Sequence, residues 1–568
     1  MMNIKKLIAG ALALVCLFAT GCGSDNSTAE APATTTRMYT TTGKSNNIFN
    51  GFSGGDAKME QAMPSTTAAV AGGAMEDCCP SENYYCIPAP DYNTESYAEV
   101  RENRFIKTTE NAVSTFSADV DTASYSNIRR MITDGNYVDP NAVRIEEMLN
   151  YFSYDYNAPK GDEPFGITTE FMDCPWNDEA KLMLVGLQAQ EIEMTETPSN
   201  IVFLVDVSGS MDSPDKLPLV QTAFTMLAEN LSENDRISIV TYAGSDRIVL
   251  SGESGANKAK IINAVCDLTA GGGTNGSAGI KTAYQLAEKH FIEGGNNRVI
   301  LATDGDLNIG ITDNDDLERY ISKKKESGVY LSVLGFGTGN IKDDKMEILA
   351  DKGNGNYSYI DSVFEARRVL VDEMGSTLVT VAKDVKLQLE FNPEIVEKYR
   401  LIGYENRIMA EEDFDDDTKD GGEIGAGHRV TVLYEIVSTE LDEDFIAYEN
   451  EKIADLAIRY KEPDGKKSKL LEYSLGEDDI GGFSKNYDGL LRGGENIEFA
   501  ACVAEFGMIL SESRYAEDSD CDDILERLEG IDSIEGDEFR EEFVELVSDY
   551  SQREDFYDEL YGYYDYYE

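Results

Sequence analysis

Four short apolar runs lie in the middle of the chain, separated by longer segments with helical periodicity. The runs are residues 201–205, 236–242, 298–303 and 329–336. A continuous apolar run of this length is typical of a strand buried on both faces. On one face of the helix predicted after the first run lie Leu217, Val220, Phe224, Leu227 and Leu231. With further helices at 277–291 and 315–325, this alternation predicts βαβ units and a doubly wound, mostly parallel sheet over residues 199–378.

The segments on either side of this region have a different period. Apolar and polar residues alternate in predicted strands at residues 166–173, 181–193, 385–391, 428–437, 453–460 and 467–474. We expect the strands from both sides to pair into one β-rich, sandwich-like domain. Residues 104–160 predict a short strand and two helices, at 125–131 and 141–152. Residues 495–551 predict helices, because Phe499, Val503, Phe506 and Leu510 share a face.

The first residues predict a targeting segment. Lys5 and Lys6 precede an apolar run at residues 7–19, which is short for a membrane span and typical of a signal peptide. The run ends in Ala-Thr-Gly before Cys22, which resembles a bacterial lipoprotein cleavage site and implies lipidation of Cys22. Residues 23–100, rich in Ser, Thr, Ala and Gly, predict a tether. We therefore expect an extracytoplasmic protein anchored to the bacterial cell membrane; the alternative is an ordinary secretory peptide with an incidental cysteine.

Charge and composition argue against several classes of function. The 568 residues carry 49 Lys+Arg against 107 Asp+Glu, a formal net charge of −58, which argues against a nucleic-acid partner. With 41% hydrophobic residues, the chain can build a core. The two histidines leave little for His-based catalytic triads or zinc sites. The cysteines have irregular spacing and predict no disulfide framework, and Cys266, on a helical pattern, is predicted to lie in the core.

Oxygen-bearing side chains gather where predicted parallel strands end. Asp206, Ser208 and Ser210 follow the first strand, Thr274 lies in a glycine-rich loop, and Asp304 follows the third strand. Ligands of open α/β sheets bind at this edge. A donor set made only of hard oxygens suits Mg²⁺ or Mn²⁺. Because hydroxyls and water complete the coordination of the ion, it stays electrophilic enough to accept a carboxylate from a partner.

This set resembles the metal-ion-dependent adhesion site (MIDAS) of a von Willebrand factor type A (VWA) domain. The family motif is an Asp-x-Ser-x-Ser sequence followed by a Thr and an Asp. The resemblance implies that Asp206, Ser208 and Ser210 bind Mg²⁺, or else Mn²⁺ or Ca²⁺, with Thr274 and Asp304 joining directly or through water. It also implies a protein partner that offers a Glu or Asp. Residues 104–550 resemble a family of bacterial lipoproteins with this domain, through segments such as 114–130 and 335–340.

The predicted organisation divides the chain into seven segments. They are a lipoprotein signal peptide (1–22), the tether (23–100), an α/β segment (101–198), the doubly wound, Rossmann-like VWA domain with its MIDAS (199–378), a β-rich domain (379–480), a helical domain (481–551) and an acidic, Tyr-rich tail (552–568). We expect a non-enzymatic protein that mediates adhesion or protein binding at the cell envelope. The alternatives are a metal-assisted hydrolase and a structural scaffold for envelope assembly. The acidic run at residues 413–417 lacks the Gly and Glu of a calcium loop and predicts a solvated loop.

Overall fold

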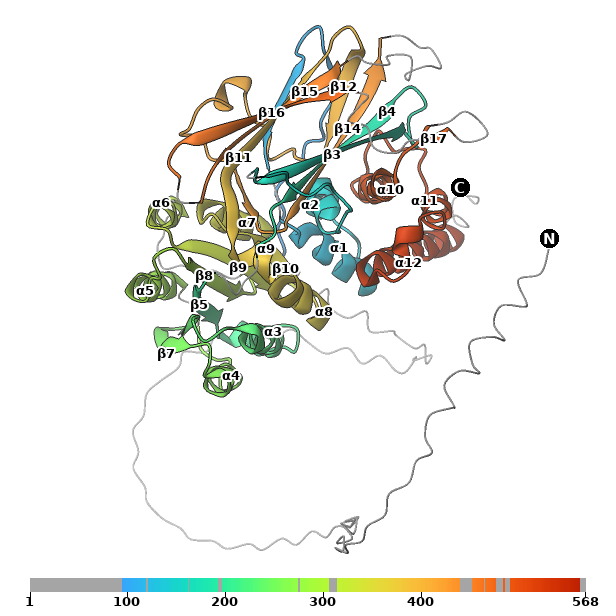
Figure 1. Cartoon of the computed structure of the whole chain (residues 1–568). Coiled ribbons are helices and arrows are strands. Elements are labelled where there is room, and N and C mark those ends of the chain that lie inside the picture. The colour runs from blue at the N-terminus through green and yellow to red at the C-terminus, as the bar shows by residue number, and fades with distance from the viewer. Residues whose placement is uncertain are drawn as a thin grey trace, which may run out of the picture. The chain divides into compact units, whose positions relative to one another are not determined.

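The computed structural model describes most of the chain after residue 93 (Figure 1). The described residues are 94–118, 121–161, 163–192, 197–273, 276–305, 314–439, 452–463, 465–476, 484–485 and 491–561. They belong to one compact unit, Cys86–Glu568. The predicted signal peptide, Cys22, nearly all of the tether and Thr274 lie outside the described residues. Within the described part, no helix has both the length and the apolar character that crossing a membrane requires.

A six-stranded sheet forms the centre of the α/β region, as the strand and helix alternation predicts. The strand order is β10-β9-β8-β5-β6-β7, and every neighbouring pair is parallel except β6 with β7. The bounds are β5 Ser199–Asp206, β6 Arg236–Tyr242, β7 Asp246–Ser254, β8 Asn296–Thr303, β9 Tyr330–Phe336 and β10 Tyr357–Ile360. Every residue of β5 and β8 is buried, which explains their uninterrupted apolar runs. The hydrophobic pattern misses β7, because Leu250 is the one buried residue of this edge strand.

Helices cover both faces of this sheet. Figure 1 shows α3 and α4 on one side of β5 and β8, and α5 and α6 on the other. Alternate residues of β5 divide between the two cores: Phe203 stacks on Phe224 of α3 at 4.1 Å, whereas Leu204 packs with Tyr284 of α5. The bounds are α3 Leu217–Asn230, α4 Lys258–Cys266, α5 Gly276–Lys289, α6 Asn314–Lys325, α7 Asp343–Lys352, α8 Val363–Arg367, a π-helical turn Arg368–Asp372 and α9 Met374–Leu378.

Two antiparallel sheets pack face to face into a sandwich. Strand β4, which precedes the α/β region, pairs with β14, which follows it, so strands from both sides share one sheet as predicted. The first sheet has the order β1-β12-β14-β4-β3, with bounds β1 Ile106–Lys107, β3 Phe165–Asp173, β4 Lys181–Ala189, β12 Val396–Ile402 and β14 Arg429–Ser438. The second has the order β13-β11-β15-β16 with β2 also on β11, and its bounds are β2 Val113–Ser117, β11 Thr380–Phe391, β13 Gly422–Gly425, β15 Lys452–Lys461 and β16 Ser468–Gly476. One shared core fills the space between the sheets.

Helices from the two ends of the described chain pack together on the first sheet. Phe152 lies 5.0 Å from Phe499 and 5.5 Å from Phe543, ring centre to ring centre, so segments far apart in sequence share one core. The elements are α1 Ala123–Thr133, η1 Pro140–Ala142, α2 Ile145–Asn150, β17 Ser484–Lys485, β18 Leu491–Arg492, α10 Glu495–Leu510, α11 Cys521–Leu528 and α12 Glu538–Tyr561. The short turns η3 Gly209–Asp212, η5 Glu411–Asp413 and η8 Asp532–Ile534 complete the described elements.

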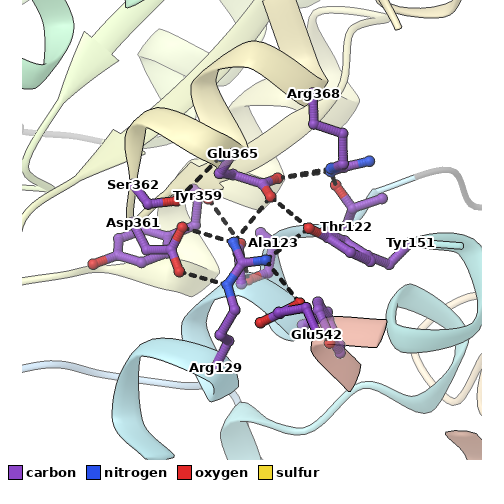
Figure 2. Close-up of polar contacts among 12 residues, drawn as sticks. Thr122, Ala123, Arg129, Tyr151, Tyr359, Asp361, Ser362, Glu365, Arg368 and Glu542 are labelled. Atoms are coloured by element: carbon purple, nitrogen blue, oxygen red, sulfur yellow. Dashed lines mark hydrogen bonds and ion pairs between the residues drawn. The ribbon is translucent and has the colours of Figure 1, made fainter. Parts of the chain in front are cut away.

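A buried polar network joins these helices to the α/β region (Figure 2). We call it the Arg129 network; its members are Thr122, Arg129, Tyr151, Asp361, Glu365, Arg368 and Glu542. The Arg129 guanidinium donates to both oxygens of Asp361, at 2.7 Å each, and to Glu365 at 3.0 Å. These two carboxylates lie in the segment between β10 and the π-helical turn. Arg129 Nη1 also donates to the Tyr151 hydroxyl at 2.7 Å, so α1, the residue after α2 and the α/β region meet at one cation.

The structure corrects several details of the predicted segments. Helix α12 continues to Tyr561, so residues predicted as tail (552–568) begin inside a helix; the ring of Tyr550, 5.7 Å from that of Phe506, holds this helix on the core. Residues 94–97, predicted as tether, pair with the α/β region through a parallel bridge between Ser96 and Lys342. Cys266 is exposed rather than in the core, because it lies on the outer face of α4.

Candidate metal centre

The first motif loop begins where β5 ends. Asp206 closes the strand and is fully buried, and its Oδ1 accepts a hydrogen bond from the Ser208 amide at 2.8 Å. The chain then turns into η3, which brings the hydroxyls of Ser208 and Ser210 within 2.9 Å of each other. Ser208 is buried and Ser210 is exposed, so the loop leads from the interior to the surface.

Asp304 reaches the same place from the neighbouring strand. Because β8 pairs in parallel with β5, Ala302 lies beside Val205. Asp206, the last residue of β5, and Asp304, the first residue after β8, therefore lie at one edge of the sheet. Asp304 is fully buried. Burial is the main reason why the pKa of Asp206 rises to about 6; hydrogen bonds from Ser208 oppose this rise, and the negative charge of Asp304 adds to it. Two mutually repelling buried carboxylates favour a cation between them.

The loop that carries the predicted threonine is fastened to the first motif loop. The amide of Gly271 donates to the carbonyl of Val207 at 2.8 Å, and the amide of Gly209 donates to the carbonyl of Gly272 at 3.1 Å. Thr274 and Asn275 lie outside the described residues, so the place of the fourth predicted ligand stays a prediction. Gly271, Gly272 and Gly273 are exposed and form part of the rim around the motif.

Sequence reasoning missed a lysine at this centre. Lys216 Nζ lies 3.0 Å from Asp304 Oδ2 and 3.4 Å from Asn340 Oδ1, and the lysine side chain is 9% exposed. Burial alone would raise the pKa of Asp304, but the Lys216 charge, with hydrogen bonds from Ser210, Lys216 and Asn340, brings it below its ordinary value. The motif spacing carries no signal for Lys216, which precedes α3 and looks in the sequence like a surface lysine.

The residues present fit a hard divalent ion. Asp206 Oδ2 is buried and makes no hydrogen bond of good geometry, and the hydroxyl of Tyr242, which interacts with this carboxyl, makes none either. Such an oxygen is costly to bury unless something compensates its charge. Around it are the two serine hydroxyls and the Asp304 carboxylate, all oxygen donors of the kind that Mg²⁺ prefers. Among the described residues, no three or more His, Cys, Asp or Glu side chains are grouped to hold a metal, so any ion here depends on hydroxyls as well as carboxylates.

Basic side chains of the protein contact the acidic run at residues 413–417. Arg459 pairs with Asp415 and with Asp417, at 3.1 Å each. Lys386 donates to the carbonyls of Asp413 and Asp416 at 2.9 and 2.6 Å. These contacts attach the loop to β11 and β15, and they do not favour a calcium site there.

The fold and the motif loops define a VWA-domain protein. The family described as "von Willebrand factor type A domain" matches residues 200–373, one described as "von Willebrand factor" matches residues 91–184, and one described as "Uncharacterized protein YfbK, C-terminal" matches residues 376–552. YfbK of Escherichia coli (strain K12) is 41% identical over 474 residues, which cover 80% of each chain. The chain therefore belongs to the YfbK family. VWA domains often bind a metal at the MIDAS and generally mediate protein binding.

Other similarities are confined to parts of the chain. Protein sll0103 of Synechocystis sp. is 32% identical over 200 residues, covering 35% of this chain and 46% of that protein. Among solved structures, the von Willebrand factor type A protein from Catenulispora acidiphila matches with a TM-score of 0.36 at 17% identity, covering 62% of this chain and 82% of that one.

Proposed function

We propose that this chain binds a protein partner outside the cytoplasm through a divalent metal ion held at Asp206, Ser208, Ser210 and Asp304, with Thr274 as a further ligand. The observation that carries the proposal is the buried Asp206 Oδ2, which makes no hydrogen bond of good geometry although Tyr242 lies close to this carboxyl, beside two hydroxyls and a second buried carboxylate. The ion would supply a positive centre for a carboxylate of the partner. The expected ion is Mg²⁺, because a small set of side-chain oxygens completed by water suits it better than Ca²⁺, which takes more ligands.

The exposure of the loops supports access for a partner. Both carboxylates are fully buried, whereas Ser210 and the glycines at 271–273 are exposed, so a ligand would approach over the loops. The glycines present no side chains on this rim, which leaves room for the partner's backbone. A Cβ added at Gly271 would meet no atom within 4 Å, so a side chain can start from this exposed position without a clash at its first atom.

Gly271→Trp therefore separates metal binding from partner binding. We expect purified Gly271→Trp to bind Mg²⁺ like wild type, while Asp206→Ala loses the ion. In cross-linking on intact cells, a specific product that forms in Mg²⁺ and not in EDTA should be lost in both variants. A product that persists in both variants would contradict a partner at the metal. If the cross-linked product were lost in Asp206→Ala but kept in Gly271→Trp, the metal site would stand, and the partner would not contact the glycine rim.

The anchoring part of the proposal rests on Cys22 and the apolar run before it. Labelled palmitate should enter wild type and not Cys22→Ser, and the variant should appear in the soluble fraction. Equal labelling of both proteins would contradict lipidation at Cys22.

We propose no catalytic role for the metal. The two histidines lie on other elements: His290 Nε2 is 3.0 Å from the Ser251 hydroxyl of β7, and His428 precedes β14. A hydrolase would need a base near the ion. Mg²⁺-dependent turnover of phosphoesters or peptides by wild type, absent in Asp206→Ala, would overturn this view. The scaffold alternative predicts metal binding with no partner at the rim.

A further inference from the structure

Lys216 places a fixed positive charge at the candidate metal centre. Its ammonium lies 3.0 Å from Asp304 Oδ2 and 3.4 Å from Asn340 Oδ1, with the side chain 9% exposed. The stem of the lysine passes over Gly337, where an added Cβ would lie 2.3 Å from Lys216 Cε. Gly337 also has a φ of +75°, which favours glycine. The lysine stem therefore packs against a position that has no side chain, and its charge lies against one of the two buried carboxylates.

The Lys216 ammonium changes the net charge of the candidate metal site. Asp206 and Asp304 alone would cancel the charge of a divalent ion. With the Lys216 ammonium present, the site has one net negative charge, so a bound Mg²⁺ keeps one net positive charge. A single carboxylate from a partner cancels that remainder. Because the site is buried, these charges interact through a medium that screens them less than water does.

We propose that Lys216 is a built-in counter-charge that weakens binding of the metal alone and makes tight metal binding depend on an acidic ligand. The inference rests on the proposed function, since it concerns the same ion. It deepens that function by stating that metal and carboxylate bind cooperatively, each raising the affinity for the other by the same factor. A lysine that only supported the loop at Asn340 would produce no such coupling.

Isothermal titration of the full chain with Mg²⁺, and with Mn²⁺ as a second probe, tests the proposal. Lys216→Gln removes the charge but keeps a hydrogen-bonding side chain, and Lys216→Arg keeps the charge. Lys260→Met is the control for net charge, because Lys260 is 63% exposed and pairs with Glu253 on the surface. We expect Lys216→Gln to bind Mg²⁺ at least tenfold more tightly than wild type, and the Lys216→Arg and Lys260→Met affinities to stay within about twofold of wild type.

Acetate serves as the carboxylate probe. In wild type, saturating acetate should raise the Mn²⁺ affinity several-fold, and this gain should shrink in Lys216→Gln. Equal metal affinity in wild type and Lys216→Gln, or an equal acetate effect in both, would overturn the role of Lys216 and leave the metal site standing. Absence of metal binding in every protein, with and without acetate, would instead overturn the proposed function. If Lys216→Gln unfolds in EDTA, wild type alone still tests the proposal, because a Mn²⁺ affinity that saturating acetate leaves unchanged would overturn the coupling.

Discussion

Replacing Arg129 by methionine should destabilise the protein more than any exposed arginine could. The Arg129 side chain is 7% exposed and pairs with Asp361, which is 8% exposed, and with Glu365, which is fully buried. Methionine matches the aliphatic stem of arginine but lacks the guanidinium head, so the substitution removes the charge together with its hydrogen bonds. Two buried carboxylates then lose a cation that makes three short hydrogen bonds to them.

The expected loss in the free energy of unfolding follows from the burial of these ion pairs. Breaking a buried ion pair by removing one partner costs about 3–5 kcal/mol, because the remaining charge is left uncompensated. Arg368 still donates to Glu365 at 2.7 Å, which moves the expected cost toward the lower end of that range. Asp361→Asn in the Arg129→Met background should recover about 1 kcal/mol or more, because it removes the stranded charge.

Urea unfolding followed by tryptophan fluorescence measures the effect. The chain has one tryptophan, Trp176, whose Nε1 donates to Glu435 at 2.9 Å, so its fluorescence reports on the first sheet of the sandwich. Arg367→Met is the matched control. Arg367, which precedes Arg368 of the network, is 42% exposed and pairs with Asp372 and Glu538, so its replacement should cost under about 1 kcal/mol. If Arg129→Met cost no more than Arg367→Met, the reasoning from the buried network would be refuted.

Three further predictions concern other sites. Glu95→Ala should increase hydrogen–deuterium exchange at the Gly339 amide, which donates to Glu95 Oε1 at 2.8 Å, while the Gly353 amide inside the α/β region stays protected; unchanged exchange at Gly339 would contradict a protecting role of this hydrogen bond. Burial raises the pKa of Glu347 to about 7 against the opposing charges of Arg144 and Arg407, so the folded protein binds the proton of this carboxyl more tightly than the unfolded chain does. The protonated carboxyl therefore contributes to the free energy of unfolding below its ordinary pKa of 4.5, and this contribution is lost as the pH rises toward 7. Glu347→Gln should therefore gain unfolding temperature relative to wild type between pH 5 and about 7.5, and a constant difference would contradict the shifted pKa. Cys266→Ser should remove one fast-reacting thiol from the native protein, whereas serine at the buried Cys502 should leave the fast thiols unchanged; equal effects would contradict the exposure of Cys266.

The central sheet could be predicted from the sequence because its strands are buried on both faces. The apolar run at residues 236–242 is the whole of β6, and the run at 298–303 lies within β8. Burial on both faces makes the pattern continuous and independent of what lies next to the strand. The partly exposed β7 and the four-residue β13 carry no such pattern, since they are defined by their pairing with β6 and β11.

Residues of the candidate site could be predicted where a short motif or a recognisable strand carries them. Asp206, Ser208 and Ser210 are close in sequence, and Asp304 follows a recognisable strand, so the sheet topology brings these four together. The positions of Lys216 and Asn340 depend on how α3 and the loop after β9 pack, which no spacing in the sequence records. The docking of residues 94–97 on that loop depends on the same packing, and so it was missed as well.

Thermal unfolding of the full chain in EDTA, Mg²⁺, Mn²⁺ and Ca²⁺ tests the metal centre most directly. Wild type, Asp206→Ala and Asp304→Ala should be compared with Asp415→Ala, which removes the same charge from a side chain that is 86% exposed. An ion at about 100 times its dissociation constant should stabilise wild type and Asp415→Ala by roughly 2.7 kcal/mol and leave the other two variants unchanged. An equal shift in Asp206→Ala, or no shift with any ion, would contradict a metal held by Asp206 and Asp304.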